Sequence, residues 1–189
     1  MYSPILAYIC SFVAMATAIS SWFVRNKKLF LTVQSIAIIL LALMNFFNAI
    51  FLPVFTYLIA FIRMIFYYSY EKSNKSVPFL IKSLFALLNV VAYFVLNAIS
   101  GTLFNPVDLL IMTASVLYAY GFGIRNLQHL RLFFVPPTVM SIIYFALIPN
   151  SLFALISYSF ELGANVVSFI MCLNREKRFL RKKEKKKVN

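Results

Sequence analysis

Long runs of apolar residues, separated by short polar gaps, make up most of this chain. A membrane-spanning helix needs about twenty such residues, so the runs predict an all-α, polytopic membrane protein. Seven membrane-spanning helices are expected, at residues 4–24, 29–48, 49–70, 79–99, 106–123, 132–149 and 151–173. A β-barrel is not expected, because the runs are continuous and do not alternate between apolar and polar residues.

Two stretches are too long for one crossing and must turn. Asn45, Asn48 and Pro53 mark the expected turn inside residues 29–70. Pro149 and Asn150 divide residues 132–173, because proline and asparagine favour turns. The pair Pro136-Pro137 is expected to begin or kink the sixth helix.

Composition supports lipid as the solvent. The chain is 62% hydrophobic and 12% charged, with a mean hydropathy of +0.87. Soluble domains carry about 25% charged residues. Residues 1–8 hold no positive charge, unlike the start of a signal peptide, so the first run is expected to be retained as a span.

The positive charges predict an orientation. Lys and Arg occur in the first gap (25–28), the third (71–75), the fifth (Arg125 and Arg131, with His129) and the tail 175–189, which holds nine of the eighteen. The second and sixth gaps hold no charge, and the fourth has only Asp108 nearby. The positive-inside rule then predicts an N-terminus outside and a C-terminus inside. The net charge of +13 therefore indicates topology and attraction to anionic lipid headgroups at the tail, with no nucleic-acid partner expected.

Short matches about 100 residues apart predict an internal repeat. They pair Arg25-Asn26 with Arg125-Asn126, Asn48 with Asn150, and Glu71-Lys72 with Glu176-Lys177. Two three-helix units in the same orientation need one crossing between them, which predicts a 3+1+3 parallel arrangement. The expected parts are repeat one at 1–76, a linker helix at 77–102, repeat two at 103–174, and a basic cytoplasmic tail at 175–189.

Three polar residues at membrane depth form the candidate site. Arg63 is a cation inside an apolar run, which costs about 2.5–3.5 kcal/mol or more. Glu161 is the one acid inside another run, and an offset of 102 residues pairs Arg63 with Asn165. We expect Arg63, Glu161 and Asn165 to converge between the units, with Gly163 permitting close backbone approach. Two alternatives stay open: Arg63 snorkels to the cytoplasmic interface, or it clamps Glu161 without any ligand.

No catalytic or metal-binding pattern accompanies these residues, so no enzyme activity, cofactor or metal is expected. Cys10 and Cys172 lie in different runs and are expected to be reduced and buried. His129 is expected to be a solvated loop residue.

The segments Ala60-Phe-Ile-Arg63, Asp108-Leu-Leu110 and Gly163-Ala-Asn165-Val-Val resemble those of the YgjV-type bacterial inner-membrane proteins. That family is similar to the SWEET and PQ-loop transporters and to the PnuC-type transporters, which are 3+1+3 bundles. The resemblance implies a multi-pass protein of the bacterial inner membrane. In SWEET-like proteins an asparagine on the third helix of each unit faces the substrate. Asn165 matches the second of these, whereas Arg63 replaces the first and the Pro-Gln dipeptide is absent.

Two functions follow from these observations. A transporter-like carrier of a small polar or anionic solute would use a central cavity that touches Arg63 and Asn165. A non-transporting scaffold or lipid-interacting protein would depend on the basic tail instead. The sequence leaves the solute, the coupling ion and the oligomeric state open.

Overall fold

The computed structural model describes residues 4–101, 104–149 and 151–188, with side chains as far as residue 174. Regular structure in these segments is entirely helical. The helices are α1 (Pro4–Trp22), α2 (Lys27–Phe47), α3 (Phe51–Lys72), α4 (Phe79–Ile99), α5 (Pro106–Gly121), α6 (Leu127–Phe133), α7 (Val135–Leu147) and α8 (Leu152–Val188).

Asparagine side chains begin three of the helices. The Oδ1 atoms of Asn26, Asn105 and Asn126 accept hydrogen bonds from the backbone N–H groups two residues later, at 2.8–3.0 Å. The first N–H groups of a helix have no partner within it, so such a cap satisfies one of them. These caps set where α2, α5 and α6 start.

Both predicted turns inside long apolar stretches are confirmed. Helix α2 ends at Phe47 and α3 begins at Phe51, with Ala49 at a φ of 59° between them. Helix α7 ends at Leu147, and α8 begins at Leu152. The turns divide residues that hydropathy alone would join.

The sixth crossing starts earlier than the sequence predicted. Helix α6 covers part of the expected fifth gap and, with α7, makes one crossing from Leu127 to Leu147. Pro136 lies in the first turn of α7, where its missing N–H costs least, so the predicted break is confirmed. The loop assignment was wrong for two residues: His129 is exposed but helical, and Arg131 is helical and buried.

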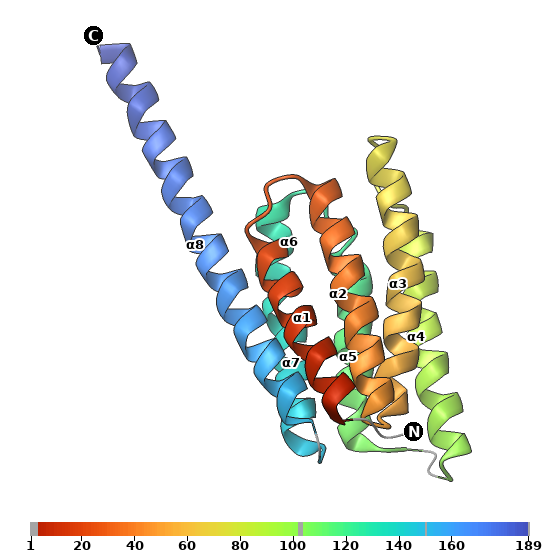
Figure 1. The fold of residues 1–189 in the computed structure, drawn as a ribbon. Coiled ribbons are helices and arrows are strands. Elements are labelled where there is room, and N and C mark those ends of the chain that lie inside the picture. The colour runs from red at the N-terminus through yellow and green to blue at the C-terminus, as the bar shows by residue number, and fades with distance from the viewer. Residues whose placement is uncertain (1–3, 102–103, 150, 189) are drawn as a thin grey trace.

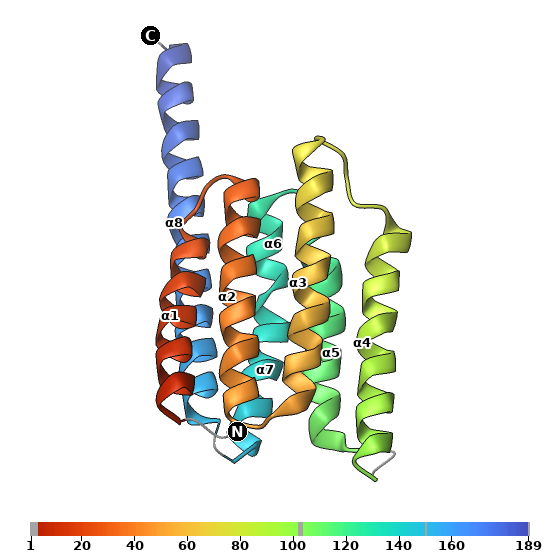
Figure 2. The same ribbon diagram turned by 45° about the vertical axis from the view of Figure 1, so that its right-hand side comes forward.

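The helices form two layers of three, with α4 at one side (Figures 1 and 2). Within one layer, α2 packs against both α1 and α3, and within the other α7 packs against both α5 and α8. The layers meet along their edges, where α1 packs on α8 and α3 on α5. Helix α4 covers the α3–α5 edge. These contacts join α1, α2, α3, α5, α7 and α8 into a six-helix ring. Packing is closest around the rim of this ring.

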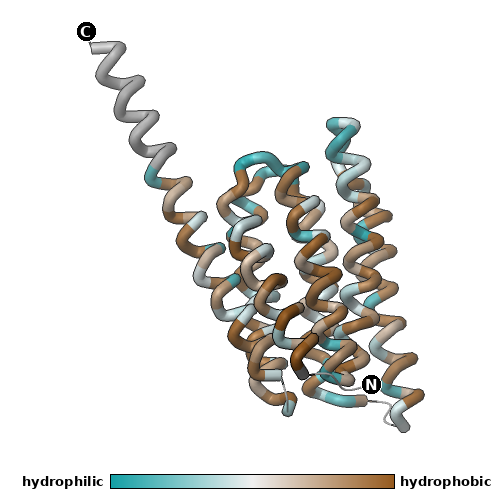
Figure 3. Tube along the Cα trace, viewed as in Figure 1, coloured by the Kyte–Doolittle hydropathy of each residue, from teal (hydrophilic) through white to brown (hydrophobic). Residues whose placement is uncertain are grey.

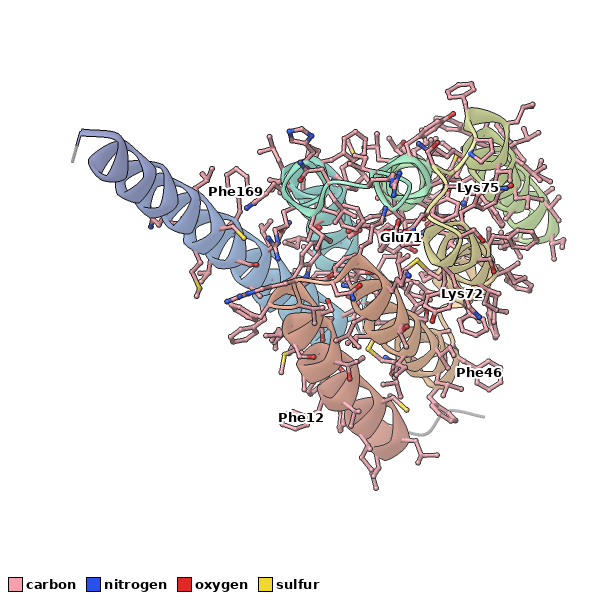
Figure 4. All side chains as sticks on the ribbon, turned by 90° about the horizontal axis from the view of Figure 1, so that it is seen from above. Phe12, Phe46, Glu71, Lys72, Lys75 and Phe169 are labelled. Atoms are coloured by element: carbon pink, nitrogen blue, oxygen red, sulfur yellow. The ribbon has the colours of Figure 1, made fainter. Side chains whose placement is uncertain are left out.

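The outer surface of the bundle is apolar. Six candidate spans (α1, α2, α3, α4, α6–α7 and the first part of α8) are long and apolar enough to cross a membrane, and α5 is a shorter apolar helix. Large side chains such as Phe12 and Phe46 point away from the bundle (Figure 4), and they are 68% and 49% exposed. A surface with so many exposed apolar side chains would be unfavourable in water. The chain is a multi-pass membrane protein.

Charged residues gather at one end of the bundle, which we call the basic end: the loops 23–26, 73–78 and 122–126 with the adjoining helix ends. Hydrophilic residues colour this end in Figure 3, and Glu71, Lys72 and Lys75 mark it in Figure 4. Helix α8 projects past the bundle on the same side (Figure 1).

Gly121 is required by packing, whereas Gly163 is not. A Cβ atom at Gly121 would lie 2.7 Å from the Phe134 ring and 2.8 Å from the Phe133 ring, but at Gly163 it would meet nothing within 4 Å. The expected close approach of backbones at Gly163 was therefore wrong.

We predict that Gly121→Ala lowers the free energy of unfolding in detergent by about 1–3 kcal/mol, because two rings must shift. Gly163→Ala, the matched control, should leave it unchanged or raise it by up to about 1 kcal/mol, because alanine favours the helix. Chemical denaturation of the purified variants measures both. Equal effects would contradict the packing at Gly121.

Candidate binding cavity between the helix layers

A cavity of about 50 Å³ lies where the two layers are held apart in the middle of the ring. Its walls come from α2, α3, α5 and α8, with the α6–α7 junction. The lining residues are Gln34, Ile38, Leu41, Thr56, Tyr57, Ala60, Arg63, Ile111, Ser115, Tyr118, Phe122, Phe134, Tyr158 and Glu161.

This volume accommodates a few water molecules, since one water needs about 10–15 Å³. Small-molecule sites usually measure about 300–1,000 Å³. The cavity is therefore smaller than a usual small-molecule site.

Arg63 supplies the positive charge of the cavity. Its side chain is 2% exposed, and its Nη1 donates to the Ser115 carbonyl on α5 at 3.4 Å. The guanidinium carbon lies 5.2 Å from the centre of the Phe122 ring, within the range of a cation–π interaction. Arg63 Nε is buried without a protein acceptor. The guanidinium is thus held by weak contacts and keeps unused donors.

Glu161 supplies the acidic group of the cavity from α8. Its Oε1 accepts hydrogen bonds from Trp22 Nε1 at 3.2 Å and from Gln34 Nε2 at 3.4 Å. Gln34 also donates to Ser21 at 2.8 Å, so residues of α1 and α2 together fix the carboxyl group of α8. All of these donors are neutral.

Arg63 and Glu161 line the same cavity without pairing. Among the side chains that the structure describes, the one ion pair is Lys27–Glu71, at 3.9 Å near the basic end. The clamp between Arg63 and Glu161, one of the two alternatives that the sequence left open, is therefore absent. Snorkelling is also absent, because Arg63 is buried and turns toward α5.

Asn165 does not join the other two residues. It lies outside the cavity lining, and its Nδ2 donates to the Arg131 carbonyl on α6 at 2.9 Å. The expected convergence of three side chains was wrong for Asn165. A ligand-binding role for Arg63, Glu161 and Asn165 stays a prediction.

Aromatic rings close the cavity toward the basic end. Trp22 packs on Phe30 and Phe134, and Phe122 packs on the same two rings, with centroids 4.5–6.1 Å apart. These four residues, the aromatic quartet, come from both layers. Toward the other end, the hydroxyl groups of Tyr57 and Tyr158 form a 2.5 Å hydrogen bond between α3 and α8.

Two buried cations at the basic end hold the layers together. Lys27 Nζ donates to the carbonyl of Ile124, which follows α5. Arg131 Nη2 donates to the carbonyls of Trp22 at 2.9 Å and Val24 at 3.3 Å, at the end of α1. A cation is favourable there, because the last carbonyls of a helix lack partners and carry partial negative charge.

Sequence reasoning missed Arg131, although a signal was present. Asn126 is an N-cap residue, and Leu127, Leu130 and Phe134 follow with helical spacing. This pattern would have extended the sixth helix backward and placed Arg131 inside it.

Comparisons with known proteins add no relative: no family model, no curated protein and no solved structure matches the chain.

The two buried arginines should respond differently to loss of charge. Arg63→Met removes a cation without a carboxylate partner and keeps its volume, so we predict an unfolding free energy within about 1 kcal/mol of the wild type or above it. Arg131→Met leaves carbonyls at the end of α1 without a donor, and should cost about 1–3 kcal/mol. Denaturation in detergent compares them. A greater loss for Arg63→Met would indicate a structural clamp.

Proposed function

We propose that this protein is a membrane carrier for a small solute that bears an anionic group. The observation that carries the proposal is Arg63, a buried guanidinium on a cavity wall that has no carboxylate partner among the described side chains. Charges at membrane depth are costly and are usually retained for function. A solute anion would neutralise Arg63 and use its free donors.

The groups on the opposite wall of the cavity indicate what else the solute would carry besides its anionic group. Glu161 presents a carboxyl group between neutral donors, and Tyr57 and Tyr158 add hydroxyl groups. A solute with an anionic group toward Arg63 and a hydrogen-bond donor toward Glu161 would match both walls. A neutral, apolar solute would leave both charges unsatisfied.

We also propose that the layers are two copies of one three-helix unit, joined by α4. Contacts between corresponding residues support the repeat. Tyr57 and Tyr158, 101 residues apart, bond to each other. In the quartet, Trp22 corresponds to Phe122, 100 residues on, and Phe30 to Phe134, 104 residues on.

The cations follow the same correspondence. Lys27 of the first unit donates to the carbonyl of Ile124, and Arg131 of the second donates to the carbonyl of Val24. Each unit thus caps the end of the first helix of the other. Such exchange is what a two-fold axis along the membrane normal would produce.

The repeat also accounts for the position of Asn165. The spacing of the two tyrosines makes Ala164, not Asn165, the counterpart of Arg63, and makes Ala60 the counterpart of Glu161. Each charge therefore faces a unit with alanine at the matching position. The proposed solute site is asymmetric inside a nearly symmetric frame.

Transport in this frame would be a rocking of the two units about the central site. The aromatic quartet closes the route toward the basic end, and the tyrosine pair narrows the route toward the other end. Opening either side would enlarge the cavity to admit solute.

Uptake into lipid vesicles tests the carrier function. With a panel of small carboxylates, phosphates and amino acids, we predict uptake by the wild type and at least a tenfold loss in Arg63→Met and Glu161→Gln. Arg125→Met, which removes an exposed arginine at the basic end, is the matched control and should retain uptake. Equal uptake by Arg63→Met and the control would sink the proposed site and favour a membrane scaffold.

For orientation we propose the bacterial inner membrane, as the YgjV-type resemblance implies, with the basic end in the cytoplasm. Cysteine labelling tests this in a Cys10→Ala/Cys172→Ala background. Ser100→Cys, beyond α4, should react with an impermeant maleimide in intact cells. Lys75→Cys, between α3 and α4, should react only after permeabilisation. The reverse pattern would invert the topology.

A further inference from the structure

A second, larger hollow lies at the basic end, outside the ring. It measures about 200 Å³ and lies among the loop after α1, helix α6 and the membrane-spanning part of α8. Its lining residues are Phe23, Arg25, Arg131, Ser168, Met171 and Cys172. We call it the α1–α6–α8 cleft.

The base of the cleft is cationic. Arg131 is 4% exposed, and its hydrogen bonds to Trp22, Val24 and Cys172 use three of the five N–H donors of a guanidinium. Arg25 is exposed beside it. Neither arginine forms an ion pair with a described carboxylate, and the described lining residues of the cleft include no acid. An anion with several acceptor oxygens would satisfy the remaining donors.

The rim of the cleft is apolar and faces outward. Phe23 is 47% exposed and Met171 is 43% exposed on the outer surface of the bundle. A soluble anion would gain nothing from this rim. A phospholipid would place its phosphate on the arginines and its acyl chains along Phe23 and Met171.

We propose that the α1–α6–α8 cleft binds the headgroup phosphate of an anionic phospholipid. Basic pockets between membrane helices at the cytoplasmic side are suited to such headgroups. The site is separate from the solute cavity, since the two linings share no residue. It is also built by folded helices, unlike the diffuse attraction expected of the tail. A bound lipid would neutralise Arg131 while it caps α1, and would tie α8 to the first unit.

Thiol labelling tests the proposal on the full chain, because Cys172 lines the cleft and is free. In Cys10→Ala protein in neutral detergent, phosphatidylglycerol should slow maleimide labelling of Cys172. Phosphatidylcholine and inorganic phosphate at equal concentration should not. Native mass spectrometry of the same samples counts the bound lipid. It provides a second readout if Cys172 reacts slowly with maleimide even without lipid.

Two matched arginine variants locate the effect. Arg25→Gln should raise the phosphatidylglycerol concentration needed for half protection about fivefold, the equivalent of one lost headgroup contact. Arg125→Gln, which removes the corresponding arginine after α5, should not change it, because Arg125 lies outside the cleft.

Four results would overturn the site. Equal protection by phosphatidylcholine would show simple coverage by acyl chains, and equal protection by inorganic phosphate would show a soluble-anion site. Equal shifts in the two variants would indicate diffuse charge attraction. If phosphatidylglycerol gave no protection and no lipid was retained in the mass spectrum, binding would be excluded altogether.

Discussion

A buried guanidinium and a buried carboxyl group, held apart at membrane depth, are the constraint on which the centre of this structure depends. A buried cation and a buried carboxyl group would normally pair, since each is costly alone. Here Glu161 is held by Trp22 and Gln34, and Arg63 by a carbonyl and an aromatic face. Their separation keeps a polar cavity between the layers. If Arg63 and Glu161 paired directly, they would form a structural clamp between the layers.

The packing around the ring makes that separation possible. The layers meet at two edges, α1 with α8 and α3 with α5, while α2 and α7 face the centre from opposite sides (Figure 2). Rigid edges leave the middle to side chains, and the aromatic quartet and the tyrosine pair fill it at two levels. Lys27 and Arg131 fix the basic end by capping helices of the opposite layer. Arg131, which the sequence placed in a loop, therefore belongs to the interface itself.

Much of the frame could be predicted because lipid imposes simple rules. Continuous apolar runs must be helices, and the prolines and asparagines within them mark turns. The placement of Arg63 and Glu161 on a common cavity also followed from their cost at membrane depth. The prediction for Asn165 was wrong because a shift of one residue rotates a helix by about 100°, and short sequence matches do not define the register that finely. The predicted close backbone approach at Gly163 was wrong because the sequence does not show whether that face of the helix contacts lipid or protein.

By itself the sequence determined the solvent, the helical class, the apolar helices and the end that collects positive charge. These follow from local composition, which each segment carries independently of its neighbours. Only the tertiary structure decided partners: that Arg63 turns to α5 rather than to Glu161, that Arg131 caps α1, and that Asn165 faces α6. Such choices depend on helix rotation and on contacts between residues about 30 to 110 positions apart in the chain, which no local pattern encodes.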